Sequence, residues 1–171
     1  NAGFLEKLVL DPADVKELLP FELLAHAGRR LRVAHDTEAA MRALVRTLEG
    51  FAQYRLFKQY HIKTWDVQPD QLPQALQEIC RTCYLQDIDG KYVLPAQAQF
   101  RLLAALDDPM GHTYLKEWPT MKPLLDAANH AVLGHGFETV KSERVQQLYD
   151  VVVRLTGFQD GSLPKFPVLT L

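Results

Sequence analysis

Two cysteines and two histidines in this chain have the side chains and the local spacing of a metal site. Cys80 and Cys83 form a C-x-x-C pair, and His130 and His135 form an H-x₄-H pair. Two thiolates and two imidazoles are a common tetrahedral ligand set for Zn²⁺. However, the two pairs lie much farther apart than the ligands of a zinc finger, and both cysteines fall on an apolar helical stripe, where a free thiol behaves as a small hydrophobe. We therefore expect no bound metal, while a small metal-dependent enzyme built on these four residues stays an alternative hypothesis.

Other catalytic patterns are incomplete. The segment QDIDG hints at a calcium loop, but with Gly90 at position six, Leu85 and Ala96 would take positions one and twelve, which require acidic ligands. The chain has no P-loop, no G-x-G-x-x-G after a strand, no G-x-S-x-G and no H-E-x-x-H, and its six histidines are scattered. The sequence therefore predicts no catalytic residue, no cofactor and no enzymatic activity.

The segment 51–65, FAQYRLFKQYHIKTW, interleaves five aromatic side chains with Arg55, Lys58 and Lys63. This pattern is typical both of surfaces that stack single-stranded RNA and of protein-interface hot spots. The formal net charge of the chain is −2, without the basic excess of most nucleic-acid-binding proteins. We therefore favour a protein partner and do not expect nucleic acid, although RNA binding remains the alternative function. The expected partner-binding residues here are Tyr54, Phe57 and Trp65.

Helices are expected to position these residues, because apolar side chains recur at three- and four-residue steps through most of the chain. Asp36 or Thr37 caps one predicted helix, Pro95 opens another, and Gly157 ends the last. Strand signals are few, and no apolar run is long enough to cross a membrane. The sequence predicts an all-α protein of six to eight helices, with one domain over 1–157 and an extended tail over 158–171.

The junction between two predicted helices, residues 75–106, resembles that of the pentatricopeptide repeat family. Gly90 and Pro95 mark its turn, and a similar start recurs at Leu19 and Pro20, about 75 residues earlier. The resemblance implies antiparallel helix pairs stacked as a short right-handed solenoid. Helical adaptors of messenger-RNA export share a similar order of aromatic, arginine and leucine residues and stay an alternative family.

The chain is similar in size and charge to the pentatricopeptide-like subunit on the catalytic head of euglenozoan mitochondrial ATP synthase. This resemblance implies a non-catalytic scaffold that docks on the alpha subunit, is mitochondrial or otherwise soluble and intracellular, and does not insert into the membrane. The missing initiator methionine fits a processed or a trimmed chain. Residues of the apolar tail are expected to lie along the partner; they are Phe166, Pro167, Val168 and Leu169.

Overall fold

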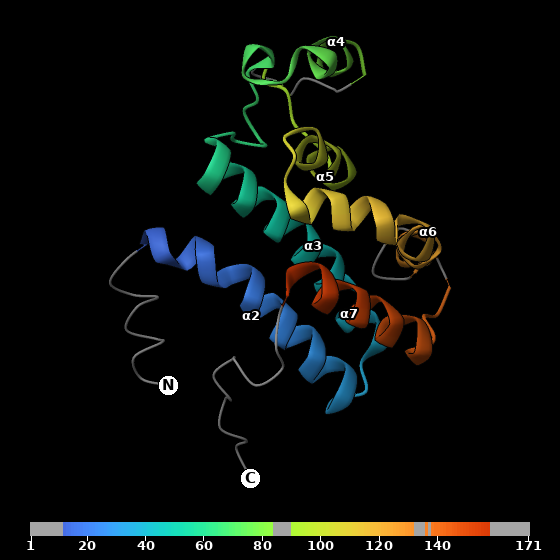
Figure 1. The fold of residues 1–171 in the computed structure, drawn as a ribbon. Coiled ribbons are helices and arrows are strands. Elements are labelled where there is room, and N and C mark those ends of the chain that lie inside the picture. Colours follow the sequence, from blue (N-terminus) through green and yellow to red (C-terminus); the bar gives the residue numbers. More distant parts are fainter. Residues whose placement is uncertain (1–11, 84–89, 132–135, 137, 158–171) are drawn as a thin grey trace. The chain divides into compact units, whose positions relative to one another are not determined.

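A computed structural model describes residues 12–83, 90–131, 136 and 138–157 (Figure 1). Within these ranges the protein consists of six α-helices, one 3₁₀ helix and two isolated β-bridges, so the predicted all-α class is confirmed. The finer prediction of a right-handed solenoid is not confirmed. The elements are α2 (Pro12–Arg32), α3 (Thr37–Tyr60), η1 (Pro69–Gln71), α4 (Gln74–Cys83), α5 (Ala96–Ala105), α6 (Pro109–His130) and α7 (Ser142–Thr156).

Several helix ends follow from local chemistry. The backbone N–H of Ala39 donates to Asp36 Oδ1 at 3.0 Å, so Asp36 is the N-cap of α3. Gly157 adopts φ +65° after α7, the left-handed conformation predicted for its C-cap. Pro95 directly precedes α5, also as predicted. None of the described helices combines the length and apolar character needed to cross a bilayer.

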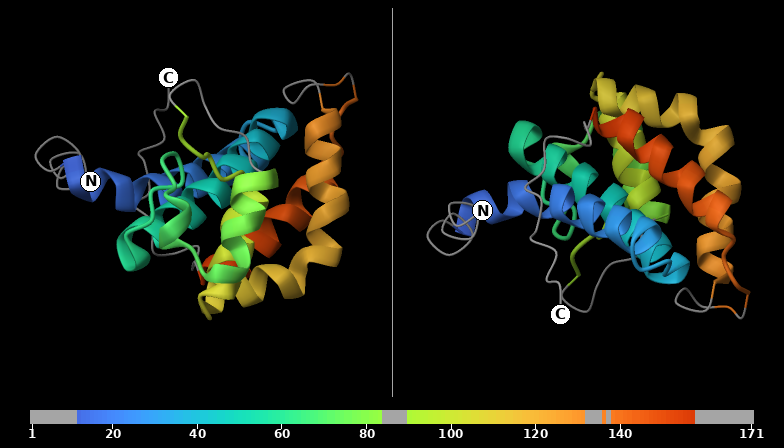
Figure 2. Two further views of the ribbon diagram at one scale, coloured as in Figure 1. Left: turned by 90° about the horizontal axis from the view of Figure 1, so that it is seen from above. Right: turned by 90° about the horizontal axis from the view of Figure 1, so that it is seen from below.

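The prolines of α6 do not divide it as the sequence suggested. We expected Pro119 and Pro123 to separate two short helices, but α6 is continuous through both. A proline removes one intrahelical hydrogen bond and clashes with the preceding turn, which can bend a helix without ending it. Figure 2 shows that α6 changes direction along its length. The prolines therefore bend the helix.

The chain divides into two compact units, residues 1–47 with 128–171, and residues 48–127. In the first unit α2 packs on α7 (Figure 1). Gly28 lets the Tyr149 ring approach the α2 backbone closely, and the Arg32 guanidinium lies 4.7 Å from the centroid of that ring. The core of this unit includes Leu24, Met41, Leu44, Val145, Leu148 and Val152.

In the second unit, the segment after α3 makes a turn, closed by the Asp66 N–H donating to the Lys63 carbonyl at 3.0 Å, and then pairs with the segment before α5. The N–H of Val67 donates to the Tyr92 carbonyl at 3.0 Å, and the N–H of Leu94 donates to the Thr64 carbonyl at 2.9 Å. The core includes a Phe100–Tyr114 stack with a centroid distance of 4.0 Å. The predictions of one domain over 1–157 and of an extended tail stay predictions, and residues 158–171 lie outside the described residues.

Candidate functional site

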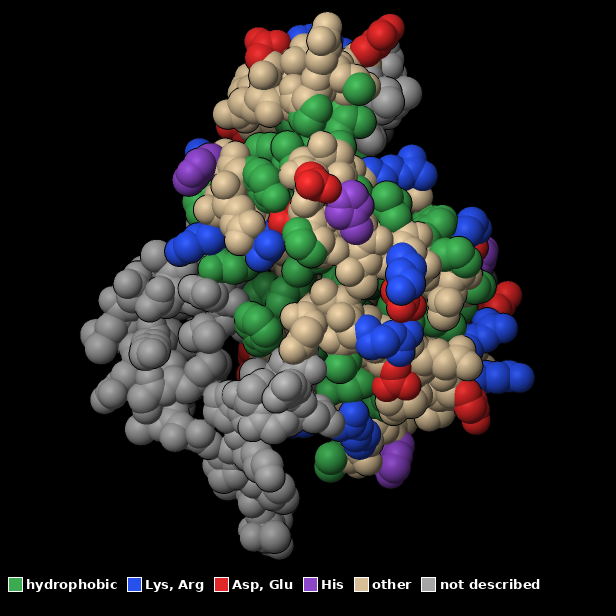
Figure 3. Space-filling model, viewed as in Figure 1, with side chains coloured by type: hydrophobic (Ala, Val, Ile, Leu, Met, Phe, Trp, Pro, Cys, Tyr) green, Lys and Arg blue, Asp and Glu red, His purple; other side chains and the backbone are tan. Residues whose placement is uncertain are grey.

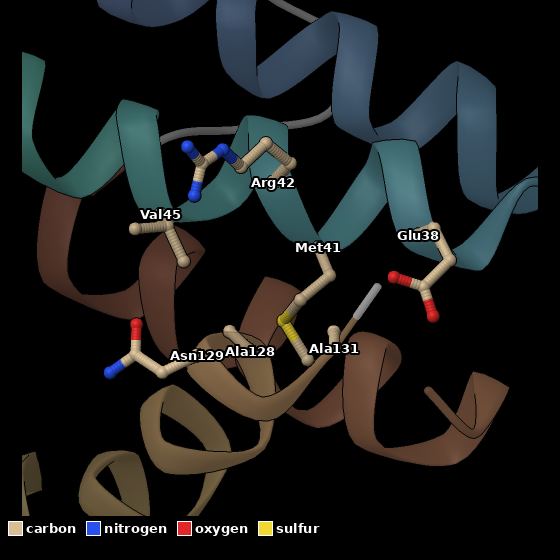
Figure 4. A pocket seen from close by; sticks show the side chains of 7 residues that line it. All are labelled: Glu38, Met41, Arg42, Val45, Ala128, Asn129 and Ala131. Carbon is tan, nitrogen blue, oxygen red and sulfur yellow. The ribbon is translucent and has the colours of Figure 1, made fainter. Parts of the chain in front are cut away.

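A shallow hollow opens on the first unit, between α3 and the end of α6 (Figure 4). Methionine and alanine side chains give it an apolar floor, while an arginine, a glutamate and an asparagine bring polar groups to its edges. It therefore offers hydrogen-bond donors, acceptors and a positive charge together. The residues that line it are Glu38, Met41, Arg42 and Val45 from α3, and Ala128, Asn129 and Ala131 at the end of α6.

The helical period of α3 explains which of its side chains line the hollow. Glu38, Arg42 and Val45 follow each other at four- and three-residue steps, so they share one face of the helix. Glu38 Oε1 accepts the backbone N–H of Val140 at 3.0 Å, whereas its buried Oε2 has no hydrogen-bond partner in the described part of the chain. A buried carboxylate oxygen without a donor is costly to keep. It is therefore an unsatisfied acceptor beneath the surface of this hollow.

Arg42 differs from most arginines of the protein. Its side chain is exposed at the edge of the hollow, and it makes no ion pair or hydrogen bond with the residues that the structure describes. In Figure 4 the Arg42 side chain runs along α3 with its guanidinium near Val45, while Asn129 lies apart from it at the end of α6. A planar guanidinium presents five N–H donors that match a phosphate or a carboxylate. Arg42 can therefore bind an anion without first breaking another contact.

The chain beyond α6 folds back on the end of that helix. The backbone N–H of Gly136 donates to the Ala131 carbonyl at 3.1 Å, and that of Glu138 donates to the His130 carbonyl at the same distance. A β-carbon at Gly136 would collide with the His130 carbonyl oxygen. These contacts fix the backbone at His130 and Ala131, on one side of the hollow.

Replacing Gly136 by alanine is expected to destabilise the protein by about 1–3 kcal/mol, because the new methyl group must displace backbone atoms. Gly28→Ala is the matched control: its β-carbon would meet the Tyr149 ring at 3.3 Å, and alanine favours the helix. Urea denaturation of the two variants and the wild type measures the difference. Equal midpoints for Gly136→Ala and wild type would show that the His130 backbone yields at little cost.

Arginines at the end of α2 already have partners. Arg29 Nη2 lies 2.6 Å from Glu22 Oε1, and Arg30 Nη1 lies 3.5 Å from Asp36 Oδ2. Arg30 Nε also donates to His26 Nε2 at 3.3 Å. Burial, together with the charges of Arg30 and Arg29, lowers the pKa of His26. These pairs give the arginines at the end of α2 a structural role.

Arg55 also has a structural partner, in the second unit. Its Nε donates to Asp108 Oδ2 at 2.8 Å, and the Tyr60 hydroxyl donates to the same oxygen at 2.9 Å. Burial alone would raise the pKa of Asp108, but hydrogen bonds from Arg55, the Met110 N–H and Tyr60 outweigh it and lower the pKa. Asp107 is exposed as the sequence suggested, whereas Asp108 is fully buried. Arg42 is thus the better candidate for binding an anion.

None of the other predicted site residues that the structure describes lines the hollow. Phe57 and Trp65 contact each other in the second unit. Tyr54 and Phe57 are half-buried, and Trp65 is 46% exposed. The tail residues Phe166, Pro167, Val168 and Leu169 lie outside the described residues, so their role stays a prediction.

The proposed zinc ligands are only partly described. Cys80 is buried with a free thiol, and burial raises its pKa. Cys83 lies in α4 with its side chain outside the described part, as is all of His135. Among the side chains described, no three potential ligands form a metal-binding group.

Comparison with known families places the chain. The model of a family described as the Csm6 HEPN domain matches residues 14–159. The chain belongs to this family. No curated protein and no solved structure gives a significant match to this HEPN domain. The family is CRISPR-associated, and HEPN domains are generally ribonuclease catalytic domains.

This membership corrects four predictions. The pentatricopeptide resemblance and the ATP synthase alpha subunit as partner are wrong, because the family is neither. The predictions of a non-catalytic scaffold and of no nucleic-acid partner are also contradicted, since HEPN domains generally act on RNA. The family resemblance and the expected absence of a nucleic-acid partner failed for physical reasons. A glycine-to-proline turn joins helices in many folds, and the net charge of a whole chain averages over local basic surfaces.

Sequence reasoning missed the hollow itself. Arg42 and Glu38 lie on a helix that was interpreted only through its apolar stripe, and Asn129 was not considered. The one available signal was polar side chains four residues apart on α3. This spacing does not indicate a binding site until the end of α6 is known to lie opposite those side chains.

Proposed function

We propose that this HEPN domain cleaves RNA and that the hollow beside Arg42 binds the reacting phosphate. The observation that supports this proposal most is an exposed arginine without a partner among the described residues, at a hollow that also holds Asn129 and Glu38. An RNA phosphate is the anion that the general activity of the family brings to such a site. Cleavage within the RNA strand starts when the ribose 2′-hydroxyl gives its proton to a base and its oxygen attacks phosphorus. It ends when the bond from phosphorus to the 5′-oxygen breaks and that oxygen takes up a proton, which leaves a 2′,3′-cyclic phosphate and a 5′-hydroxyl.

Candidate groups for this reaction lie at the hollow or next to its lining residues in the sequence. The guanidinium of Arg42 neutralises the charge that builds on the phosphate oxygens in the transition state. Exposed Asn129 can orient a phosphate or a base at the edge of the hollow. Imidazole is the side chain most often used for proton transfer near neutral pH, and His130 stands between two lining residues in the sequence. His130 is therefore proposed as the proton-transferring group.

Incubation of the full chain with an end-labelled single-stranded RNA, and with DNA of the same sequence, tests this proposal. We expect cleavage of the RNA only, with products that carry a 2′,3′-cyclic phosphate and a 5′-hydroxyl. An RNA with a single 2′-deoxyribose should resist cleavage at the bond that follows that sugar. Intact RNA in the presence of excess protein, or equal cleavage of DNA, would rule out the proposed reaction.

A further inference from the structure

A second surface, on the unit of residues 48–127, has the features of a binding site for single-stranded nucleic acid. Trp65 is 46% exposed, and its ring lies against that of Phe57 with a centroid distance of 6.3 Å. Phe57 supports one part of the indole while much of the rest faces solvent. An exposed tryptophan held by a neighbouring ring is a ready platform for a planar ligand.

The surroundings of this tryptophan are basic. Residues 57–66 carry the cations Lys58 and Lys63 and one acidic residue, Asp66, directly after Trp65. Lys58 and Lys63 are exposed, and neither forms an ion pair with the described residues. Figure 3 shows Lys, Arg and His side chains over this end of α3. The local charge is therefore positive although the chain as a whole is acidic.

The backbone holds these side chains in a defined arrangement. Residues 61–65 alternate between exposed and buried, with Ile62 and Thr64 inward and His61, Lys63 and Trp65 outward. Hydrogen bonds from Ile62 N–H to the Leu56 carbonyl, at 3.1 Å, and from Leu94 N–H to the Thr64 carbonyl, at 2.9 Å, anchor the segment. The outward residues are thus presented together on a supported segment.

We propose that the surface formed by Phe57, Lys58, His61, Lys63 and Trp65 binds single-stranded RNA. A base stacks on the indole of Trp65, and the two lysines contact phosphates. A single strand is required because bases paired in a duplex do not offer a free face to a side chain. The choice of RNA over a protein partner rests on the proposed function and on the two lysines, since lysine is depleted at protein interfaces.

Binding to a fluorescently labelled 12-nucleotide 2′-O-methyl RNA tests the stacking. This probe cannot supply an attacking 2′-hydroxyl, so binding is measured without cleavage. Trp65→Ala in the full chain is expected to raise the Kd about 5- to 150-fold, the range for losing one stacked base. Trp65→Phe keeps a ring and should stay within about threefold of the wild type. Leu115→Ala, at a leucine that is 45% exposed on α6, is the matched control and should leave the Kd unchanged.

The salt dependence of the same binding tests the lysines. For a single strand, each phosphate contact contributes about 0.7 to the slope of log K against log salt, so Lys58→Ala with Lys63→Ala should reduce that slope by about 1.4. Lys116→Ala with Lys141→Ala removes two other exposed lysines that make no ion pair in the described part, and should leave the slope unchanged.

The outcomes separate this proposal from that of cleavage. Binding that depends on Trp65 supports the surface even when the wild type cuts no RNA. Wild-type binding by Trp65→Ala overturns the surface even when the protein cleaves RNA. Loss of a protein partner, but not of RNA binding, in Trp65→Ala would show that this is a protein interface and also overturn it.

Discussion

Replacing Arg42 by alanine is expected to lower the rate of RNA cleavage by about 10²- to 10³-fold, the usual effect of removing one group that stabilises charge in a transition state. The side chain stands exposed at the edge of the hollow and has no partner among the described residues. Its removal therefore leaves no buried group unpaired. Initial rates of cleavage of the labelled single-stranded RNA, at saturating and limiting protein, measure the effect.

Two further variants sharpen this test. Arg42→Lys keeps the charge but loses the planar two-pronged donor, so its rate should fall between those of the wild type and Arg42→Ala. Arg144→Ala removes an arginine on α7 that is also exposed and unpaired within the described residues, and it should cleave RNA at the wild-type rate. All three variants should unfold within about 0.5 kcal/mol of the wild type. Wild-type cleavage by Arg42→Ala would exclude the hollow as the phosphate site.

Replacing Asp108 by alanine is expected to cost about 3 kcal/mol of stability, because the Arg55 guanidinium, the Tyr60 hydroxyl and the Met110 N–H lose their common buried acceptor. The Asp108 carboxylate is fully buried and accepts three hydrogen bonds, from Arg55, Tyr60 and the Met110 N–H. These bonds join the last turns of α3 to the start of α6 within one unit. Denaturant unfolding measures the loss.

Asp70→Ala serves as the control for Asp108→Ala. Asp70 also lies 2.8 Å from an arginine, Arg81, but its side chain is 90% exposed. An exposed pair contributes at most about 1 kcal/mol, so the control should differ little from the wild type. Comparable losses in both variants would show that burial of Asp108 is not what makes its pair strong.

The same carboxylate predicts how stability depends on pH. The pKa of Asp108 is lower in the folded protein than its ordinary value, so the unfolded chain binds this proton more tightly. The stabilisation is therefore complete above the ordinary carboxyl range and is lost as the pH falls through the folded pKa. Unfolding free energies between pH 7 and pH 3 should fall less steeply for Asp108→Asn than for the wild type. Parallel curves would assign the acid sensitivity to other groups.

Sequence alone determined the features of this protein that depend on near neighbours in the chain. The all-α class followed from apolar periodicity, the Asp36 cap from one side chain and the N–H three residues on, and the Gly157 end from the freedom of glycine at positive φ. The start of α5 at Pro95 was also predicted correctly. Each of these depends on interactions that a short window of sequence contains.

Burial and long-range pairing were decided only by the tertiary structure. Asp107 and Asp108 look alike in the sequence, but one is 98% exposed and the other is fully buried under Arg55 and Tyr60 from about 50 positions earlier. The hollow likewise forms only where Glu38 and Arg42 on α3 meet Asn129 at the end of α6. No local pattern predicts such meetings, because they depend on which helices pack together. Packing therefore decides whether an arginine forms an ion pair within the protein or can bind an external anion.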